Sequence, residues 1–295
     1  MVVWSGVRKF SAVAFGTGAG FSAYLYQHIK SEERQVHSSW TNSDKPINPF
    51  AIWDSNWDFR NPRHLVKPAK NDSPQEENRY NSDLEKSTTR SVRHIILVRH
   101  GEYLDAGETD DTHCLTQKGC IQAKYAGQRL REMGLKWDKI IVSTMTRAQE
   151  TAEIILKEID FEPKKVVNCP YIREGAPIPP QPPVGHWRPQ ESQFFRDGAR
   201  IEAAFRRYFH RAFPTDKKDT YTLIVGHGNV IRYFVCRALQ FPPEAWLRIN
   251  VNHASITWLT IQPSGNVTIK CLGDSGFMPA QYLTNRIPSE AKNVV

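Results

Sequence analysis

The sequence predicts an α/β protein: a three-layer α/β/α sandwich with a mostly parallel sheet, preceded by an N-terminal membrane helix and a linker. Short apolar runs alternate with helical patterns over residues 92–295, and such alternation is typical of a parallel sheet covered by helices. Two of the apolar runs end at a histidine that glycine follows, His100 and His227. Because open α/β sheets bind ligands at the carboxyl ends of their strands, both histidines are expected at one crevice.

The N-terminal element, over residues 10–26, is apolar or small throughout and carries no charge. Its length of about 17 residues is at the short limit for a spanning helix. Gly16 and Gly20 continue a small-residue spacing that begins at Ala12, which allows close helix packing in lipid. A cleaved secretory signal and a soluble amphipathic anchor are the alternatives, but no clear cleavage pattern follows the apolar run. We therefore expect residues 1–29 to be a transmembrane anchor.

Residues 30–91 are expected to be a polar linker, because prolines recur in it and no long periodic segment is present. One part of it, residues 53–58, is called the tryptophan island here. Tryptophans in a linker must bury their large side chains somewhere. They could pack on the domain that follows, or dock on a neighbouring chain and form an oligomer. We favour docking on a neighbour, with the contact residues Trp53, Asp54, Asn56, Trp57 and Asp58.

The elements of the sandwich follow from apolar periodicity and turn residues. Strands are expected over 94–98, 139–143, 221–225, 255–259 and 266–271, and helices over 78–86, 116–133, 146–158, 201–212 and 230–239. The last two strands flank a Ser264-Gly265 turn, which predicts a hairpin.

Composition limits the classes of partner. The chain has 295 residues, is 40% hydrophobic and carries a net charge of +8. This charge suits anionic partners such as phosphate groups or a membrane surface. A nucleic-acid partner is not expected, because no long Lys/Arg block or zinc-type spacing is present. No cluster of ligand residues argues for a metal or another cofactor.

Phosphoryl chemistry is the first functional hypothesis that the residues support. Arginine supplies planar, permanently charged donors for phosphate oxygens, and Arg99 directly precedes the first histidine. Imidazole is nucleophilic at neutral pH and forms covalent intermediates. Two imidazoles and an arginine at one crevice therefore suit a nucleophile that accepts a phosphoryl group.

The chain resembles the histidine phosphatase superfamily, also called the phosphoglycerate mutase-like family. Five motifs in order carry the resemblance, at residues 98–102 (VRHGE), 115–123 (LTxxGxxQA), 143–152 (STMTRAQETA), 173–174 (RE) and 225–229 (VGHGN). The resemblance implies that His100 is phosphorylated and that Arg99 and Arg147 hold phosphate oxygens. It implies that His227 stabilises the transferring group, that Glu174 donates a proton to the leaving oxygen, and that no metal takes part.

One departure from the sugar-phosphate mutases of the family bears on the substrate. Those enzymes follow the first histidine motif with a longer polar stretch that shapes a small pocket, whereas Tyr103 and Leu104 follow here and the next motif arrives early. This difference predicts a more open site and argues against mutase activity. The proline-rich stretch at residues 176–183 could wall a peptide groove or could simply be a rigid surface loop.

The whole layout resembles one branch of that superfamily, the mitochondrial serine/threonine-protein phosphatases. This resemblance implies phosphoprotein substrates, a homo-oligomer assembled and stimulated by the tryptophan island, and a stress-pathway protein kinase as a further partner. It also implies a single N-terminal span in a mitochondrial membrane, with the outer membrane favoured over the inner. The alternatives are a small-molecule phosphomonoesterase and a catalytically idle scaffold that binds kinases or mitochondrial factors.

Overall fold

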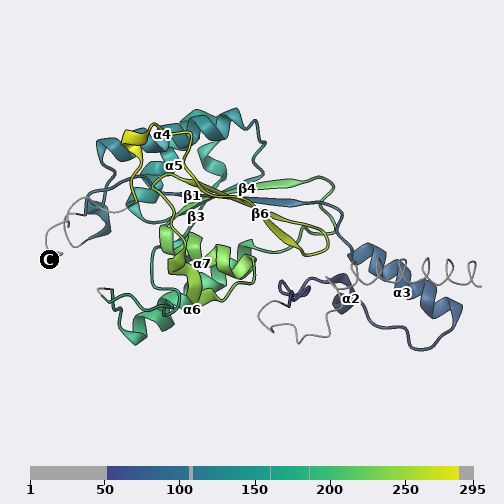
Figure 1. Cartoon of the computed structure of the whole chain (residues 1–295). Coiled ribbons are helices and arrows are strands. Elements are labelled where there is room, and N and C mark those ends of the chain that lie inside the picture. The colour runs from purple at the N-terminus through teal and green to yellow at the C-terminus, as the bar shows by residue number, and fades with distance from the viewer. Residues whose placement is uncertain (1–51, 106–108, 160, 186, 286–295) are drawn as a thin grey trace, which may run out of the picture. The chain divides into compact units, whose positions relative to one another are not determined.

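A six-stranded sheet in the order β3-β2-β4-β1-β5-β6 forms the centre of the computed structural model (Figure 1). Its strands are β1 (Arg93–Arg99), β2 (Lys139–Ser143), β3 (Val166–Cys169), β4 (Thr220–Gly226), β5 (Ile256–Ile261) and β6 (Val267–Asp274). The structure describes residues 52–105, 109–159, 161–185 and 187–285. The expected membrane segment, residues 10–26, lies outside the described residues. Among the described helices, none has the length and apolar character that a membrane crossing requires.

The sheet is mixed, and four of its six strands are parallel, in keeping with the expectation of a mostly parallel sheet. Strands β3, β2, β4 and β1 are parallel, whereas β5 runs antiparallel to β1 and β6 antiparallel to β5. The expected hairpin forms the antiparallel β5–β6 pair. Gly265 has a φ of 92° in its turn, so the chain reverses directly from β5 into β6 without the crossover helix that a parallel pair needs.

Helices cover both faces of the sheet, as the predicted sandwich requires. They are α4 (Gln117–Glu132) and α5 (Thr146–Ile159) on one face, and α6 (Glu191–Tyr208) and α7 (Gly228–Ala238) on the other (Figure 1). The central strand β1 shows why two cores form. Ile95 and Leu97 are fully buried in the cluster that includes α6 and α7, whereas Ile96 and Val98 are fully buried in the cluster that includes α4, because successive side chains on a strand point to opposite faces.

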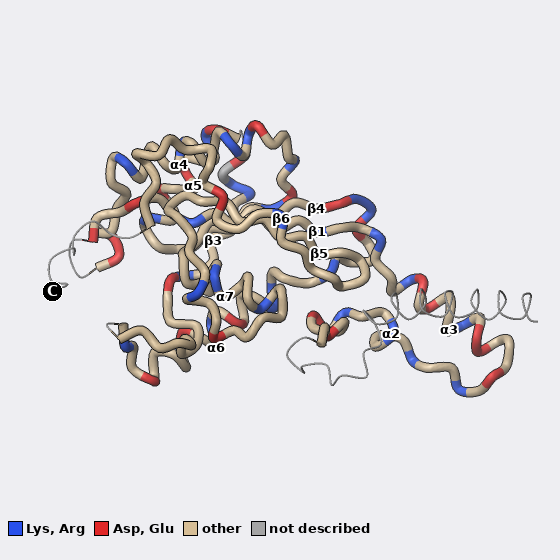
Figure 2. The backbone as a smooth tube through the Cα atoms, in the orientation of Figure 1, with Lys and Arg blue, Asp and Glu red and all other residues tan. Residues whose placement is uncertain are grey.

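Shorter elements complete the described chain. They are α2 (Pro62–Leu65), α3 (Pro74–Ser87) and the 3₁₀ helices η2 (Asp110–Thr112), η3 (Pro163–Lys165), η4 (Pro170–Ile172), η5 (Pro243–Arg248) and η6 (Ala280–Tyr282). The charged helix expected within the linker is α3, which begins earlier than predicted because Ser73 caps it and Pro74 occupies its first turn. Acidic and basic residues are interspersed along α3 and the sandwich (Figure 2).

Helix α6 differs most from its prediction, which covered residues 201–212. It begins at Glu191, ten residues earlier than predicted. It ends at Tyr208, because Phe209 already adopts an extended conformation. Beyond the end of the helix, Arg211 is 2% exposed and contacts Asp58 of the tryptophan island.

The tryptophan island packs on its own domain in this single chain, which was the alternative interpretation of that segment. The Trp57 indole Nε1 donates to the Gly265 carbonyl at 2.8 Å, and its ring lies 5.9 Å from that of Phe205. Trp53 is partly buried against the same core cluster. Both indoles therefore pack against this one core cluster.

A buried ion pair fixes the island. Arg211 donates to the Asp58 carboxylate at 2.9 Å, and the two side chains are 2% and 0% exposed. The Asp58 carboxylate also accepts from the Arg211 backbone N–H at 2.8 Å. Because Arg211 holds the ionised carboxylate, the pKa of Asp58 lies below its ordinary value, although burial alone would raise it. Asp54 adds reciprocal hydrogen bonds with Gln240, its N–H donating at 2.8 Å and its carbonyl accepting at 3.0 Å.

The residues that receive the island, called the socket here, are Phe205, Arg211, Gln240, Ser264 and Gly265. Two of them lie in the β5–β6 turn, beyond the Ile261 end of β5, and Ile261 pairs with Arg93 at the start of β1. Arg211 and Gln240 follow the carboxyl ends of α6 and α7. The socket is therefore at the opposite end of the sheet from the end of β1 that carries His100.

Candidate active site

The two histidine motifs meet because β1 and β4 are parallel neighbours. Their register pairs Arg99 with Gly226, and the His100 N–H continues the pairing by donating to the Gly226 carbonyl at 2.9 Å. His100 and His227 therefore leave the same edge of the sheet, and their ring centroids are 5.1 Å apart. The structure thus brings both predicted histidines to one crevice at the strand carboxyl ends.

The surroundings of His100 fix which ring nitrogen can react. Its Nδ1 lies 2.8 Å from the Gly101 carbonyl, which can only accept, so Nδ1 carries the proton and Nε2 keeps a lone pair. The Arg147 Nε–H donates to this Nε2 at 3.3 Å. Burial, with repulsion from the charged Arg99 and Arg147, holds the pKa of His100 well below its usual range. The imidazole is therefore neutral and nucleophilic at Nε2.

The loop that carries His100 is clamped by the second motif. A Cβ on Gly119 would lie 1.9 Å from the Glu102 carbonyl oxygen, and one on Gly101 would lie 2.5 Å from the Gly119 oxygen. Only glycine at both positions permits this approach of two backbones. Gln122 accepts from the Glu102 N–H at 2.7 Å, and Thr116 donates to the Glu102 carboxylate at 3.0 Å. The 115–123 motif therefore holds the His100 loop in place.

Hydrogen bonds fix both terminal nitrogens of Arg99, so its Nε is the donor left without a partner among the described residues. Its Nη1 donates to the carbonyls of Val251 at 2.8 Å and Asn285 at 3.1 Å, and its Nη2 donates to His253 Nε2 at 3.0 Å. His253 is locked in turn by a contact of 2.8 Å between its Nδ1 and the Thr284 hydroxyl. The Arg99 Nε is buried and has no hydrogen-bond partner among the described residues. Burial lowers the pKa of Arg99 to about 10, which still leaves it charged at neutral pH.

Arg147 contacts His100, and two neighbouring residues orient its guanidinium group. Its guanidinium carbon is 4.5 Å from the centroid of the Tyr103 ring, and its Nη1 is 3.7 Å from an Asp110 carboxylate oxygen. Within the described part of the chain, Nη1 is buried without a hydrogen-bond partner. Tyr103, which replaces the polar stretch of the mutases, therefore forms one wall of the site by stacking on Arg147.

His227 contributes a further donor. Ser143 Oγ lies 2.7 Å from His227 Nε2, and the same hydroxyl accepts from the Met145 N–H at 3.4 Å. The Ser143 hydroxyl can therefore donate its proton to His227 Nε2. In that arrangement the imidazole carries its own proton on Nδ1. This Nδ1 is buried with no partner among the described residues. Burial, with repulsion from Arg147 and Arg99, holds the pKa of His227 well below its usual range, so the ring is a neutral donor.

Glu174 has the environment of a proton donor. One carboxylate oxygen accepts from the Gly175 N–H at 3.1 Å and the other from the Asn229 N–H at 3.4 Å. Burial raises the pKa of Glu174, although Arg147 and Arg99 oppose the shift. A carboxyl group with a raised pKa keeps its proton to a higher pH than an ordinary carboxyl group, which suits a proton donor. Asn229, expected to orient these groups, also donates from its side chain to the Gly175 carbonyl at 3.1 Å.

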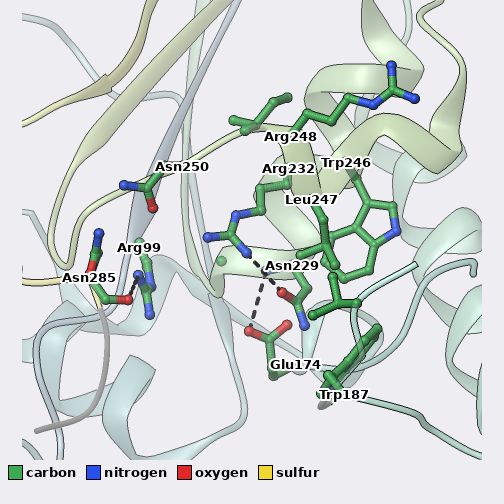
Figure 3. A pocket seen from close by; sticks show the side chains of 13 residues that line it. Arg99, Glu174, Trp187, Asn229, Arg232, Trp246, Leu247, Arg248, Asn250 and Asn285 are labelled. Carbon is green, nitrogen blue, oxygen red and sulfur yellow. Dashed lines mark hydrogen bonds between the residues drawn. The ribbon is translucent and has the colours of Figure 1, made fainter. Parts of the chain in front are cut away.

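A cavity of about 490 Å³ opens beside these groups (Figure 3). It is lined by Arg99, Glu174, Val184, Trp187, Gly228, Asn229, Arg232, Trp246, Leu247, Arg248, Ile249, Asn250 and Asn285. The proline-rich stretch at residues 176–183 is tied to this wall, because the carbonyls of Ile178 and Gln181 accept from Trp246 and Arg248, each at 2.9 Å. This contact favours the groove-wall interpretation of the stretch.

Comparison with known proteins agrees with this geometry. The family model for the histidine phosphatase superfamily (branch 1) matches residues 95–175 and 181–274. The chain belongs to the histidine phosphatase superfamily. Its phosphoglycerate mutase-like fold is the one expected from the sequence, with a mixed sheet.

Several proteins similar to this chain carry the name serine/threonine-protein phosphatase Pgam5, mitochondrial. One, from Drosophila virilis, is 72% identical over 289 residues, which cover 98% of this chain and 100% of the relative. Another, from Drosophila mojavensis, is 71% identical over 289 residues with the same coverage. Among solved structures, a phosphoglycerate mutase from Plasmodium falciparum is 32% identical, with 70% of this chain and 100% of that chain covered, at a TM-score of 0.45.

Sequence reasoning missed several residues of this superfamily member's site. Ser143 was only part of a motif, Tyr103 only a departure from the mutases, and Asp110 and His253 were not noticed. Ser143 could have been found, because it ends a predicted strand next to the one that carries His227. His253 gave no signal, since a lone histidine between the last motif and the hairpin is unremarkable in sequence. Among the described residues, no group of three or more His, Cys, Asp or Glu is arranged to hold a metal ion.

The buried His253 predicts a pH-dependent stability. Burial, with repulsion from Arg99 and Arg147, lowers its pKa to about 2, whereas an unfolded histidine titrates near 6.5. Below about pH 6.5 the unfolded chain therefore binds a proton that the folded chain excludes, and the free energy of unfolding falls as the pH falls. From pH 7.5 to 5.5 this histidine should account for a loss of about 1 kcal/mol.

Urea unfolding at both pH values checks this expectation. His253→Gln, whose amide can still accept from Arg99, should lose about 1 kcal/mol less than the parent between pH 7.5 and 5.5. His64→Gln, at an exposed position, is the matched control. An unchanged pH dependence in His253→Gln would contradict the buried neutral state.

Proposed function

We propose that the chain is a protein serine/threonine phosphatase that works through a phosphohistidine at His100. The observation that carries the proposal is the set of buried donors around Nε2. Arg99 Nε, Arg147 Nη1 and His227 Nδ1 are all buried without hydrogen-bond partners among the described residues, and unpaired buried donors are costly unless a ligand satisfies them. Phosphate oxygens are such a ligand, and Nε2 of a neutral imidazole is the nucleophile beside them.

In the first half-reaction, the lone pair of His100 Nε2 attacks phosphorus and the bond from phosphorus to the serine oxygen breaks. For this attack, Arg147 must transfer its hydrogen bond from Nε2 to a phosphate oxygen. The leaving oxygen takes the proton from Glu174. The phosphorylated ring is positively charged, and its Nδ1–H remains bonded to the Gly101 carbonyl, which stabilises that charge.

In the second half-reaction, water attacks the phosphohistidine. The Glu174 carboxylate formed in the first step takes a proton from this water. The bond from phosphorus to nitrogen breaks and its electron pair returns to Nε2, so both His100 and Glu174 recover their starting states. The three donors around the phosphoryl group stabilise its charge in both steps.

The substrate class rests on the relatives and on the shape of the site. The relatives are named serine/threonine-protein phosphatases, which supports phosphoprotein substrates here. The cavity beside Glu174 has room for residues that flank a phosphoserine, and Tyr103 stands where a mutase places its substrate-enclosing stretch. A phosphomonoesterase for small molecules and an idle scaffold are the alternatives, and the intact donor set argues against the scaffold.

Replacing His100 with alanine tests the nucleophile and the substrate class together. The parent should dephosphorylate a phosphoserine peptide and show no mutase activity on phosphoglycerates. His100→Ala should lose about 10⁴-fold or more in kcat/KM, as expected when a covalent nucleophile is removed. Asn168→Ala, at an exposed position on the edge strand β3, is the control for an alanine substitution outside the site. Peptide turnover close to that of the parent in His100→Ala would refute the mechanism, and faster turnover of phosphoglycerate than of peptide would favour the small-molecule alternative.

Glu174 is tested by leaving-group dependence and by pH. Because the leaving serine oxygen needs a proton, Glu174→Gln should lower kcat/KM for a phosphoserine peptide by about 10²–10⁴-fold. An aryl phosphate, whose leaving group needs no proton, should lose far less. In the parent, kcat/KM for the peptide should fall as the pH rises through the raised pKa of Glu174. The pH profile for the aryl phosphate should show no such fall. Equal losses and identical pH profiles on both substrates would contradict the role.

A mitochondrial address and a membrane anchor belong to the same proposal. The relatives' names include the word mitochondrial, which supports that address for this chain. The uncharged stretch at residues 10–26 supports a single N-terminal span, and we expect the outer rather than the inner membrane. A stress-pathway protein kinase remains an expected partner by resemblance alone.

Assembly through the tryptophan island is the remaining part of the proposal. A socket that binds the island of its own chain offers the same contacts to the island of a neighbour, so exchange between chains requires no new surface. Helix α7 begins at the His227 motif and ends just before Gln240, which binds Asp54. Docking of the island can therefore influence the site along α7, and this supports stimulation by assembly.

The double variant Trp53→Ala/Trp57→Ala tests the assembly. Buried aromatic anchors typically contribute 2 kcal/mol or more to an interface, so association should weaken by at least about 30-fold. Light scattering on the full chain in detergent should give a smaller mass, and peptide turnover should fall. Phe59→Ala, next to the island but 66% exposed, is the control. Unchanged mass with a reduced rate would mean that the island acts within its own chain; unchanged mass and rate would refute both roles.

A further inference from the structure

The cavity beside the proposed catalytic groups contains a cation that the phosphoryl transfer does not use. Arg232 lies on α7, one turn after Gly228. Its Nη1 makes a long hydrogen bond of 3.4 Å to the Asn229 side-chain oxygen. Its Nε is buried without a partner, and it forms no ion pair with any carboxylate in the described part of the chain. Arg232 is thus a half-buried guanidinium with most of its donors unused.

Such an arrangement is unfavourable without a ligand. Burial lowers the pKa of Arg232 and only the charge of Glu174 opposes this, so desolvation is incompletely compensated. The other half-buried arginine of α7, Arg237, differs in this respect, because it donates to Glu202 at 2.9 Å. The same helix therefore carries one arginine with a carboxylate partner inside the fold and one that faces the cavity without such a partner.

The position of Arg232 indicates where its ligand would come from. Figure 3 shows its guanidinium between Asn250 and Asn229, on the side of the cavity that holds Arg99 and Glu174. Trp187 and Trp246 lie across from it, with ring centroids 5.6 Å apart. A peptide whose phosphoserine reaches His100 must extend past Arg99 and Glu174, and successive residues of an extended chain advance about 3.3 Å. Side chains one to three positions from the phosphoserine can therefore enter this cavity.

We propose that Arg232 binds an anionic side chain that flanks the phosphorylated residue, so that the enzyme prefers acidic or multiply phosphorylated segments. This inference rests on the proposed protein phosphatase function. Aspartate, glutamate and a second phosphoresidue share the chemistry that a planar guanidinium recognises, two parallel hydrogen bonds to paired oxygens. Asn250 lines the same cavity.

Two other roles for Arg232 would have different consequences. If Arg232 contacted the transferring phosphate or positioned Glu174, its removal would slow every substrate. If it binds a flanking anion, its removal slows only substrates that carry one. The dependence on substrate sequence therefore separates the proposal from both alternatives.

The experiment compares matched phosphoserine peptides in the full chain. Each position from three residues before to three residues after the phosphoserine is varied among alanine, aspartate, phosphoserine and lysine, and an aryl phosphate serves as the substrate without flanks. The parent should favour aspartate or phosphoserine over alanine by about 10–100-fold in kcat/KM at one or two positions, the range for a charge-assisted pair. The two acidic arms distinguish a carboxylate from a second phosphate as the preferred anion.

Three variants complete the design. Arg232→Gln should abolish the acidic preference and keep turnover of the alanine peptide and the aryl phosphate within about 3-fold of the parent. Arg232→Glu should shift the preference to lysine at the same positions. Arg248→Gln is the matched control, because Arg248 lines the same cavity but points away from Arg99 and Glu174 (Figure 3), and it should keep the acidic preference.

The outcomes are separable from those that test the proposed function. Turnover of the alanine peptide by the parent reports on the phosphatase activity itself. An equal loss on all substrates in Arg232→Gln, an acidic preference that survives that substitution, or no acidic preference in the parent would each overturn the inference while leaving the phosphatase proposal intact.

Discussion

The hydrogen-bonded register between β1 and β4 is the constraint on which the site depends. It pairs Arg99 with Gly226 and continues one residue further, where the His100 N–H donates to the Gly226 carbonyl at 2.9 Å. A slip of one residue would turn every side chain of the slipped strand to the opposite face of the sheet. The His100 loop and the helix that starts at His227 would then no longer meet. The apolar residues of both strands, buried on both faces, fix this register, so the core and the site are specified together.

Burial then sets the protonation states that the chemistry needs. It lowers the pKa of His100 and raises that of Glu174, because a low-dielectric environment disfavours the charged form of either group. The result is a neutral nucleophile beside a carboxyl group that can hold a proton. The arginines oppose the second shift while strengthening the first, so the same cations that we propose to bind phosphate also keep the imidazole neutral.

The sequence was sufficient where periodicity and motifs acted locally. The strands that carry His100 and His227, helices α4, α5 and α7, and the hairpin were predicted close to their observed bounds. The four-residue strand β3 was missed, because a short run of two valines before Asn168 has no clear period. The end of α6 was also missed, because it depends on the pairing of Arg211 with Asp58, 153 residues away in the chain.

The candidate site shows the same division. The five residues Arg99, His100, Arg147, Glu174 and His227 could be predicted because they lie in recognisable motifs, and the structure gathers them around one crevice. Their supports could not be predicted, because they act through tertiary contacts. His253 aims Arg99 at 3.0 Å, and the tautomer of His227 depends on a serine from a different strand. Only the folded chain reveals which of these single residues face the site.

The identity of the phosphorylated nitrogen tests the central claim most directly. The parent enzyme would be mixed with a radiolabelled phosphoserine peptide, quenched in alkali within milliseconds, and digested to separate the two phosphohistidine isomers. Because Nδ1 of His100 is bonded to the Gly101 carbonyl, the account predicts phosphate on Nε2 of His100, stable in alkali and labile in acid. Phosphate on Nδ1, or peptide turnover with no phosphoenzyme at any time point, would contradict the account.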